Sequence, residues 1–140
     1  MRQIRRTDDA VVVEGDDRDL TYRPRQVTLS DGGWVAHASR GGTLNSVWAV
    51  DLGARFVEVV HLGAGPSGGE LVVVVPDADA VLIGDLGEEA DGPVPASWPE
   101  ALTHVLQLVR PTTRVLTTSG ELTRDELESF VHRIAERIDG

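Results

Sequence analysis

Cysteine and lysine are both absent from this sequence of 140 residues. Without cysteine the chain has no disulfide, no thiolate zinc site and no cysteine nucleophile. All 13 basic residues are arginines, against 23 acidic residues, and the net charge is −10. Because this charge repels phosphate backbones and anionic lipids, we expect no nucleic-acid or membrane binding without a local basic patch. The candidate patch is Arg2, Arg5 and Arg6, which we interpret as a frayed, solvated chain end.

Long apolar runs are missing as well. The longest run covers residues 71–75, which is strand length and far below the roughly 20 residues of a membrane helix. No apolar segment follows the N-terminal arginines, so we predict no secretory signal and a cytoplasmic protein. A chain of 140 residues with 41% hydrophobic residues and 15 glycines is long enough for one folded domain with its own core.

Short β-branched or apolar runs, bounded by turn residues, predict strands along most of the chain. The predicted strands cover residues 10–13, 34–38, 46–52, 55–62, 71–75, 80–84 and 113–117. Between residues 20 and 29 the pattern is broken by Pro24, so we expect an edge strand or an extended linker there. The turn residues 51–54 predict a hairpin between the strands on either side.

Two helices are predicted in the C-terminal third, each with a capping-box pattern at its start. Ser97 and Glu100 have this spacing at the first helix, which Pro111 ends, and Thr123 and Glu126 have it at the second. The expected inward residues are Leu102, Val105, Leu106 and Val109 in the first helix, and Leu127, Phe130, Val131, Ile134 and Ile138 in the second. Strands followed by helix, strand and helix indicate an α+β or α/β sheet covered by helices on one face.

Four segments occur in an order that resembles a known family. They are HLGAGPSGGEL at residues 61–71, VLIGDL at 81–86, SWP at 97–99 and VLTTSG at 115–120. Together they resemble the C-terminal half of metallo-β-lactamase-fold hydrolases over residues 45–138. The resemblance implies an α+β fold that is half of an αββα sandwich, a mixed sheet backed by two C-terminal helices. Residues 1–140 would form this single half domain, with divergent strands in residues 1–44.

The resemblance also implies a vestigial pocket of five residues. The family pattern places a histidine, usually followed by threonine, where this chain has Pro66 and Ser67, and another histidine where it has Ser119. Asp85 stands at the one retained ligand position, and His61, which opens the first segment, ends a strand near the pocket. The H-x-H-x-D-H cluster of the family's other half has no counterpart here. We therefore expect no bound metal, no cofactor and no catalytic residue.

The residues themselves give the same expectation. Zinc requires three or four converging nitrogen, oxygen or sulfur ligands, so one carboxylate cannot hold it. His61 ends a strand, where it can hydrogen-bond a loop carbonyl or act as a base. Asp85 can cap backbone amides of the loop that follows it. The four histidines, at 37, 61, 104 and 132, show no i, i+4 pairing.

Competing kinds of site have weaker signals. The glycine-rich residues 63–69 lack the Gly-Lys-Ser/Thr ending of a phosphate-binding loop. Ser67 and Ser119 lack a G-x-S-x-G nucleophile elbow, and we interpret both as turn residues. The acidic run near Asp85 resembles a hard-cation site, but a solvated loop is the commoner meaning of such a run.

Half a sandwich would leave one sheet face uncovered, including alternate residues of 56–60, 71–75 and 81–83. A large exposed apolar face marks an interface. We therefore expect a homodimer in which two half domains cover each other about a two-fold axis. Two alternatives stay open: a different partner protein, or residues 1–45 folding back as extra strands.

Three functions follow as hypotheses. The first is a non-catalytic metallo-β-lactamase-like protein that acts as a homodimeric interaction or small-molecule-binding module. The alternative is a metal-dependent hydrolase with a site rebuilt around Asp85 and His61, either within one subunit or shared between subunits. The third is a regulatory subunit of a full-length relative.

Overall fold

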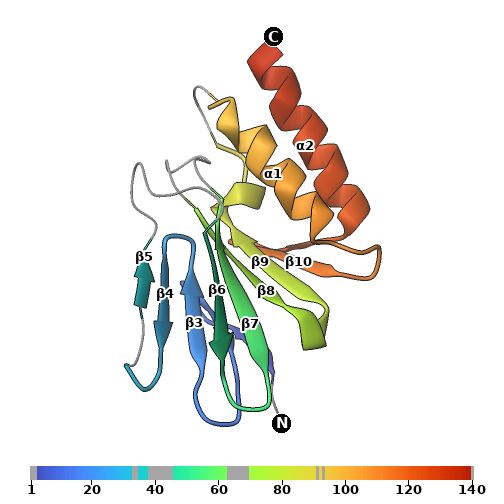
Figure 1. The fold of residues 1–140 in the computed structure, drawn as a ribbon. Helices are drawn as coiled ribbons and strands as arrows, with labels where there is room; N and C mark the ends of the chain where they lie inside the picture. The colour runs from blue at the N-terminus through green and yellow to red at the C-terminus, as the bar shows by residue number, and fades with distance from the viewer. Residues whose placement is uncertain are drawn as a thin grey trace.

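The computed structural model describes residues 3–32, 35–37, 46–62, 70–90, 92 and 94–139. These residues form an α+β fold with two β-sheets and two α-helices, which confirms the α+β part of the predicted fold class, while the half-sandwich assignment stays a prediction (Figure 1). The chain crosses from the first sheet to the second between residues 37 and 46. In the described ranges, neither helix has the length and apolar character needed to cross a membrane.

The first sheet is antiparallel, and its strands neighbour one another in chain order. Its strands are β1 (Ile4–Arg6), β2 (Val11–Val13), β3 (Leu20–Arg23), β4 (Gln26–Leu29) and β5 (Val35–His37). Arg5 and Arg6 pair with β2, so the predicted frayed end is wrong for them, and Arg2 lies outside the described residues. The expected edge strand or linker around Pro24 is also wrong, since Pro24 occupies the tight turn of the β3–β4 hairpin. Proline suits that turn position because its φ is already fixed.

The second sheet has six strands in the order β11-β10-β9-β8-β7-β6. They are β6 (Ser46–Asp51), β7 (Phe56–His61), β8 (Leu71–Val75), β9 (Ala80–Gly84), β10 (Arg114–Thr117) and β11 (Glu121–Leu122). The predicted β6–β7 hairpin is confirmed, because Asp51 pairs with Phe56 across its turn. β9 and β10 are parallel and every other pair is antiparallel, so the sheet is mixed.

Two helices follow the strands: α1 (Ser97–Gln107) connects β9 to β10, and α2 (Arg124–Asp139) follows β11. The capping box of α2 is confirmed, since the Thr123 N–H donates to Glu126 Oε1 at 2.9 Å and the Glu126 N–H donates to Thr123 Oγ1 at 3.2 Å. The capping box predicted for α1 is wrong. The helix already begins at Ser97, so its N-cap residue is Ala96. No side-chain hydrogen bond caps this end of the helix.

The second sheet lies between two cores. On one face, α1 and α2 bury Trp98, Leu102 and Phe130 against β8, β9 and β10. Ile138 was expected to point inward, but it is 39% exposed in the last turn of α2. The other face packs on β1–β4, so that the layers are sheet, sheet and helices (Figure 1).

The face predicted to lie open is therefore covered by the chain's own N-terminal strands. Val57, Val59, Leu71, Val73 and Val75 are all 0% exposed and belong to the core shared with the first sheet. At about 25 cal/mol per Å² of apolar area, this burial is a main source of the stability of the fold. The premise of the homodimer prediction is wrong for this face, and the dimer itself stays a prediction. The described strands of residues 1–45 fold back over this face, as in the alternative that the sequence left open.

Candidate functional site

Two loops lie together where the parallel strands β9 and β10 end. β9 runs into a 3₁₀ turn at Asp85–Gly87, and β10 turns back into β11 through residues 118–120. We call residues 84–88 and 117–120 the rim. The carboxyl ends of adjacent parallel strands meet at one edge of a sheet, which is where ligands bind in many α/β proteins.

Only glycine fits at position 84, where the rim begins, because of its backbone angles and its close neighbours. Its φ of 55° and ψ of −128° lie in a region open to glycine and strained for other residues. A Cβ at this position would stand 2.6 Å from the Tyr22 hydroxyl and 3.0 Å from Pro24 Cγ. Tyr22 is itself fixed, because its hydroxyl donates to the Leu71 carbonyl at 2.7 Å. The rim is thus held closely against the first sheet.

Asp85, the retained ligand position of the resemblance, is half-buried and connects the two loops. The Thr118 hydroxyl donates to Asp85 Oδ1 at 2.6 Å, and the Thr118 N–H donates to the Gly84 carbonyl at 3.2 Å. Asp85 was expected to cap amides of its own loop. The hydrogen bond described for its side chain instead comes from a hydroxyl of the neighbouring loop, 33 residues further along the chain.

Ser119, which stands where the family pattern has a histidine, makes a second connection. Its N–H donates to Glu88 Oε2 at 2.8 Å, and its hydroxyl lies 2.8 and 2.9 Å from the two oxygens of the same carboxylate. Partial burial acts to raise the pKa of Glu88, but hydrogen bonds from Ser119 and Thr117 outweigh it and lower that pKa. Glu88 is therefore an ionised acceptor within the rim, whereas the sequence indicated only a solvated acidic loop.

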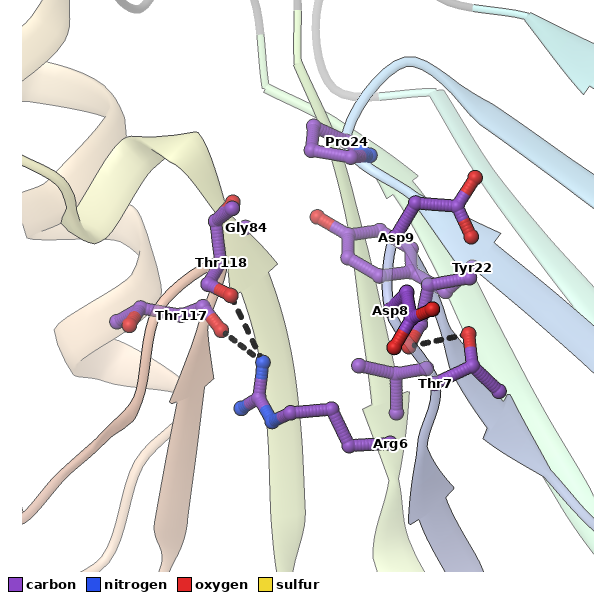
Figure 2. A pocket seen from close by; sticks show the side chains of 11 residues that line it. Arg6, Thr7, Asp8, Asp9, Tyr22, Pro24, Gly84, Thr117 and Thr118 are labelled. Carbon is purple, nitrogen blue, oxygen red and sulfur yellow. Dashed lines mark hydrogen bonds between the residues drawn. The ribbon is translucent and has the colours of Figure 1, made fainter.

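Arg6 fastens β1 to the rim from the other sheet (Figure 2). Its guanidinium donates to the carbonyls of Thr117 at 2.9 Å, Thr118 at 2.9 Å and Gly120 at 2.8 Å. Sequence reasoning missed this contact because more than 110 residues separate the partners. The short pattern Ile4-Arg5-Arg6 gives no local signal for it.

A small pocket lies between the β1–β2 turn and the rim (Figure 2). Its volume is about 50 Å³. Its lining combines an apolar wall with hydroxyl, carboxylate and guanidinium groups, from Arg6, Thr7, Asp8, Asp9, Ala10, Val11, Tyr22, Pro24, Gly84, Thr117 and Thr118. Whole-metabolite sites usually measure at least about 300 Å³. This pocket is therefore the size of a few waters or one small polar group.

His61 and Glu70 are two buried polar residues at the ends of neighbouring strands. His61 ends β7 and is 5% exposed, while Glu70, just before β8, is 0% exposed. Burial raises the pKa of Tyr22 well above its ordinary value, and the charges of Glu70 and Asp85 raise it further. Sequence reasoning missed both residues: Tyr22 stands in no motif, and Glu70 lies in the quoted segment 61–71 but at none of the family's ligand positions. Pro66 and Ser67, the other predicted pocket residues, lie outside the described residues.

The donor set of the rim does not fit the metal that the family resemblance implies. Over the described ranges, no three His, Cys, Asp or Glu side chains gather closely enough to hold an ion. One Asp85 oxygen accepts a hydrogen bond from Thr118, and both Glu88 oxygens lie within hydrogen-bonding distance of Ser119. Zinc would require three or four converging donors from this region.

Comparison with known proteins assigns no family. No protein-family model matches the chain, and no curated protein matches it. The likeness to metallo-β-lactamase-fold hydrolases therefore rests on the sequence segments alone.

Proposed function

We propose that this chain is a non-catalytic metallo-β-lactamase-like protein that acts by binding, as a homodimer. One observation carries the proposal: the two described residues at family ligand positions connect the rim loops to each other. Asp85 accepts a hydrogen bond from Thr118, and Ser119 donates to Glu88. In a metal site such groups face the ion and are oriented by other residues. Here their hydrogen bonds instead join the two rim loops to each other.

The energetics favour this role. A net contribution of about 1 kcal/mol per hydrogen bond makes these contacts a useful part of the stability of a small domain. A metal ion would have to displace them and would gain only two carboxylates in return. The close contacts of Gly84 with Tyr22 and of Gly87 with Thr117 restrict any rearrangement of the loops.

Metal analysis tests the non-catalytic part of the proposal. The protein is purified without chelator, and zinc, manganese and iron are measured by mass spectrometry in the wild type, in Asp85→Ala and in Asp79→Ala. Asp79 is the matched control because its carboxylate bonds Thr112 and Thr113, away from the rim. We expect substoichiometric metal in all three proteins. One metal per chain in the wild type and in Asp79→Ala, lost in Asp85→Ala, would contradict the proposal and favour the hydrolase built around Asp85 and His61.

Small-molecule binding is a second candidate function, and the pocket between the β1–β2 turn and the rim favours it. Its size suits a group of a few heavy atoms, such as a small amine, alcohol or amide. Ala10→Leu is a control that fills the pocket, because Ala10 is buried in its lining. In amide NMR spectra recorded with such fragments, we expect shifts at residues 7–10, 84 and 117–118 in the wild type and none in the variant. Equal shifts in both proteins would contradict this assignment.

A further inference from the structure

β6 is an edge strand with little protection against pairing. Over the described residues it pairs on one side only, with β7, and the register runs without a bulge from Ser46 to Asp51. Residues 46–50 carry no charge and no proline in a chain of net charge −10, and the one charged residue of β6, Asp51, stands at its end. Val47 is 56% exposed and Trp48 is 38% exposed. Natural edge strands usually carry a charge, a proline or a bulge, and a regular apolar edge is a template for another strand.

The register shows which main-chain groups of β6 point outward. The Leu52 N–H donates to the Arg55 carbonyl at 2.8 Å, so residues 52 and 55 are a hydrogen-bonded pair of the antiparallel ladder. Such pairs alternate with non-hydrogen-bonded ones, so Trp48 and Val50 bond to β7. Val47, Ala49 and Asp51 therefore direct their N–H and C=O groups away from β7. The contact of Arg18 agrees with this, since its Nε donates to the outward Asp51 carbonyl at 2.9 Å.

We propose that two copies of this chain pair through β6, antiparallel, about a two-fold axis at Trp48. This inference deepens the proposed function, because it assigns the surface by which the homodimer forms. In this register Val47 pairs with Ala49 of the second copy, and Ala49 with its Val47. The outward groups of these residues then exchange four hydrogen bonds. A register centred on Ala49 would need the Asp51 carbonyl, which Arg18 already occupies.

A second copy fits this edge better than a charged partner does. Residues 46–50, which pair in this register, are uncharged, so two chains of net charge −10 can approach there without direct like-charge contacts. Pairing residues 46–50 of the two copies, with the exposed parts of Val47 and Trp48, buries on the order of 1,000 Å² in total. That area is at the lower end for a specific interface, so we expect a weak dimer with a dissociation constant on the order of micromolar.

A single introduced cysteine tests the register directly, because the chain contains none of its own. At the axis the two Trp48 positions form a non-hydrogen-bonded pair with Cα atoms about 4.5 Å apart, which is within the range of a disulfide. We expect Trp48→Cys to form a covalent dimer under mild oxidation. Phe56→Cys is the control, since Phe56 is 63% exposed on β7 and lies off the axis. If Trp48→Cys stays monomeric, or cross-links no faster than Phe56→Cys, the proposed register is wrong.

Sedimentation equilibrium with proline at residue 49 tests the surface. The Ala49 N–H points away from β7, so Ala49→Pro removes outward hydrogen bonds and spares the β6–β7 ladder. We expect the dimer dissociation constant to rise at least about 30-fold, the effect of two lost hydrogen bonds. Ala49→Val keeps the N–H and should dimerise as the wild type does. Val47→Lys gives the same test without proline if Ala49→Pro does not fold.

The outcomes separate this inference from the proposed function. A wild-type dimer that Ala49→Pro and Val47→Lys leave unchanged would overturn the β6 interface and leave the homodimer in place. A wild type that is monomeric at about 100 μM, well above the expected micromolar constant, would overturn both the interface and the homodimer. Neither result bears on the metal content, which tests the non-catalytic part separately.

Discussion

Replacing Arg6 with methionine tests the contact between β1 and the rim, which sequence reasoning missed. The change keeps most of the side-chain volume and removes three guanidinium hydrogen bonds to the carbonyls of residues 117, 118 and 120. Hydrogen bonds of a charged donor contribute roughly 1.5–3 kcal/mol each when buried. Arg6 is exposed, however, and water can solvate the freed carbonyls. We therefore expect a total loss of about 2 kcal/mol.

Urea unfolding followed by circular dichroism measures this loss. Arg5→Met is the matched control, because Arg5 precedes Arg6 on β1 and makes an exposed ion pair with Glu14 at 3.0 Å. It should cost less than about 1 kcal/mol. Arg6→Lys keeps the charge but loses the fork of donors, so it should recover less than half of the loss. If Arg6→Met and Arg5→Met are equally stable, Arg6 does not fasten β1 to the rim.

Two further predictions concern stability. Trp98→Ala should lower the free energy of unfolding by about 3–5 kcal/mol. The change opens a cavity and removes the hydrogen bond from the indole N–H to the Leu86 carbonyl at 2.9 Å. A loss below about 1 kcal/mol in urea unfolding would contradict this prediction. Hydrogen bonds from the Thr112 and Thr113 hydroxyls lower the pKa of Asp79 in the folded protein. The ionised Asp79 carboxylate therefore stabilises the fold fully above its unfolded pKa of about 4, and this stabilisation is lost as the pH falls through the lower folded pKa. Unfolding measured from pH 7 to pH 3 should show this loss, and Thr113→Val should reduce it; identical pH dependence in the variant would contradict this cause.

Local patterns predicted the elements well where the signal lay within one segment. The runs at residues 71–75 and 80–84 are β8 and β9 with the predicted bounds. The capping box at Thr123 and Glu126 formed because Thr123 stands just before the first residue of α2, whereas Ser97, at the same spacing from Glu100, is already inside α1. The hairpin at residues 51–54 likewise depends only on its own turn residues and flanking strands.

Elements that depend on distant partners were predicted poorly. β1 has only three residues, and its register with β2 and its Arg6 contact to the rim come from the tertiary structure. Pro24 breaks the strand pattern, yet its turn lets two strands pair on either side of it. Coverage of the second sheet by the first follows from the packing of two sheets, which no single segment encodes.

The vestigial pocket stays a prediction, and the structure places two of its residues near each other. Asp85 and Ser119 do lie on adjacent loops, as the motif order suggested. Their partners Thr118 and Glu88 were not predictable, because a threonine or glutamate in a polar loop has many alternatives. The approach of Tyr22 to Gly84 was invisible for the same reason, since 62 residues separate them and the contact needs both sheets.

The central claim is that the rim loops are joined by their own side chains at positions where the resembled family would bind metal. Its most direct test is the free energy of unfolding of the wild type, Asp85→Asn, Thr118→Val and the double variant, each measured with chelator and with excess zinc. We predict a coupling of about 1 kcal/mol between Asp85 and Thr118 that is the same in both conditions. Stabilisation of the wild type that grows with zinc concentration, and is abolished by Asp85→Asn, would contradict the claim.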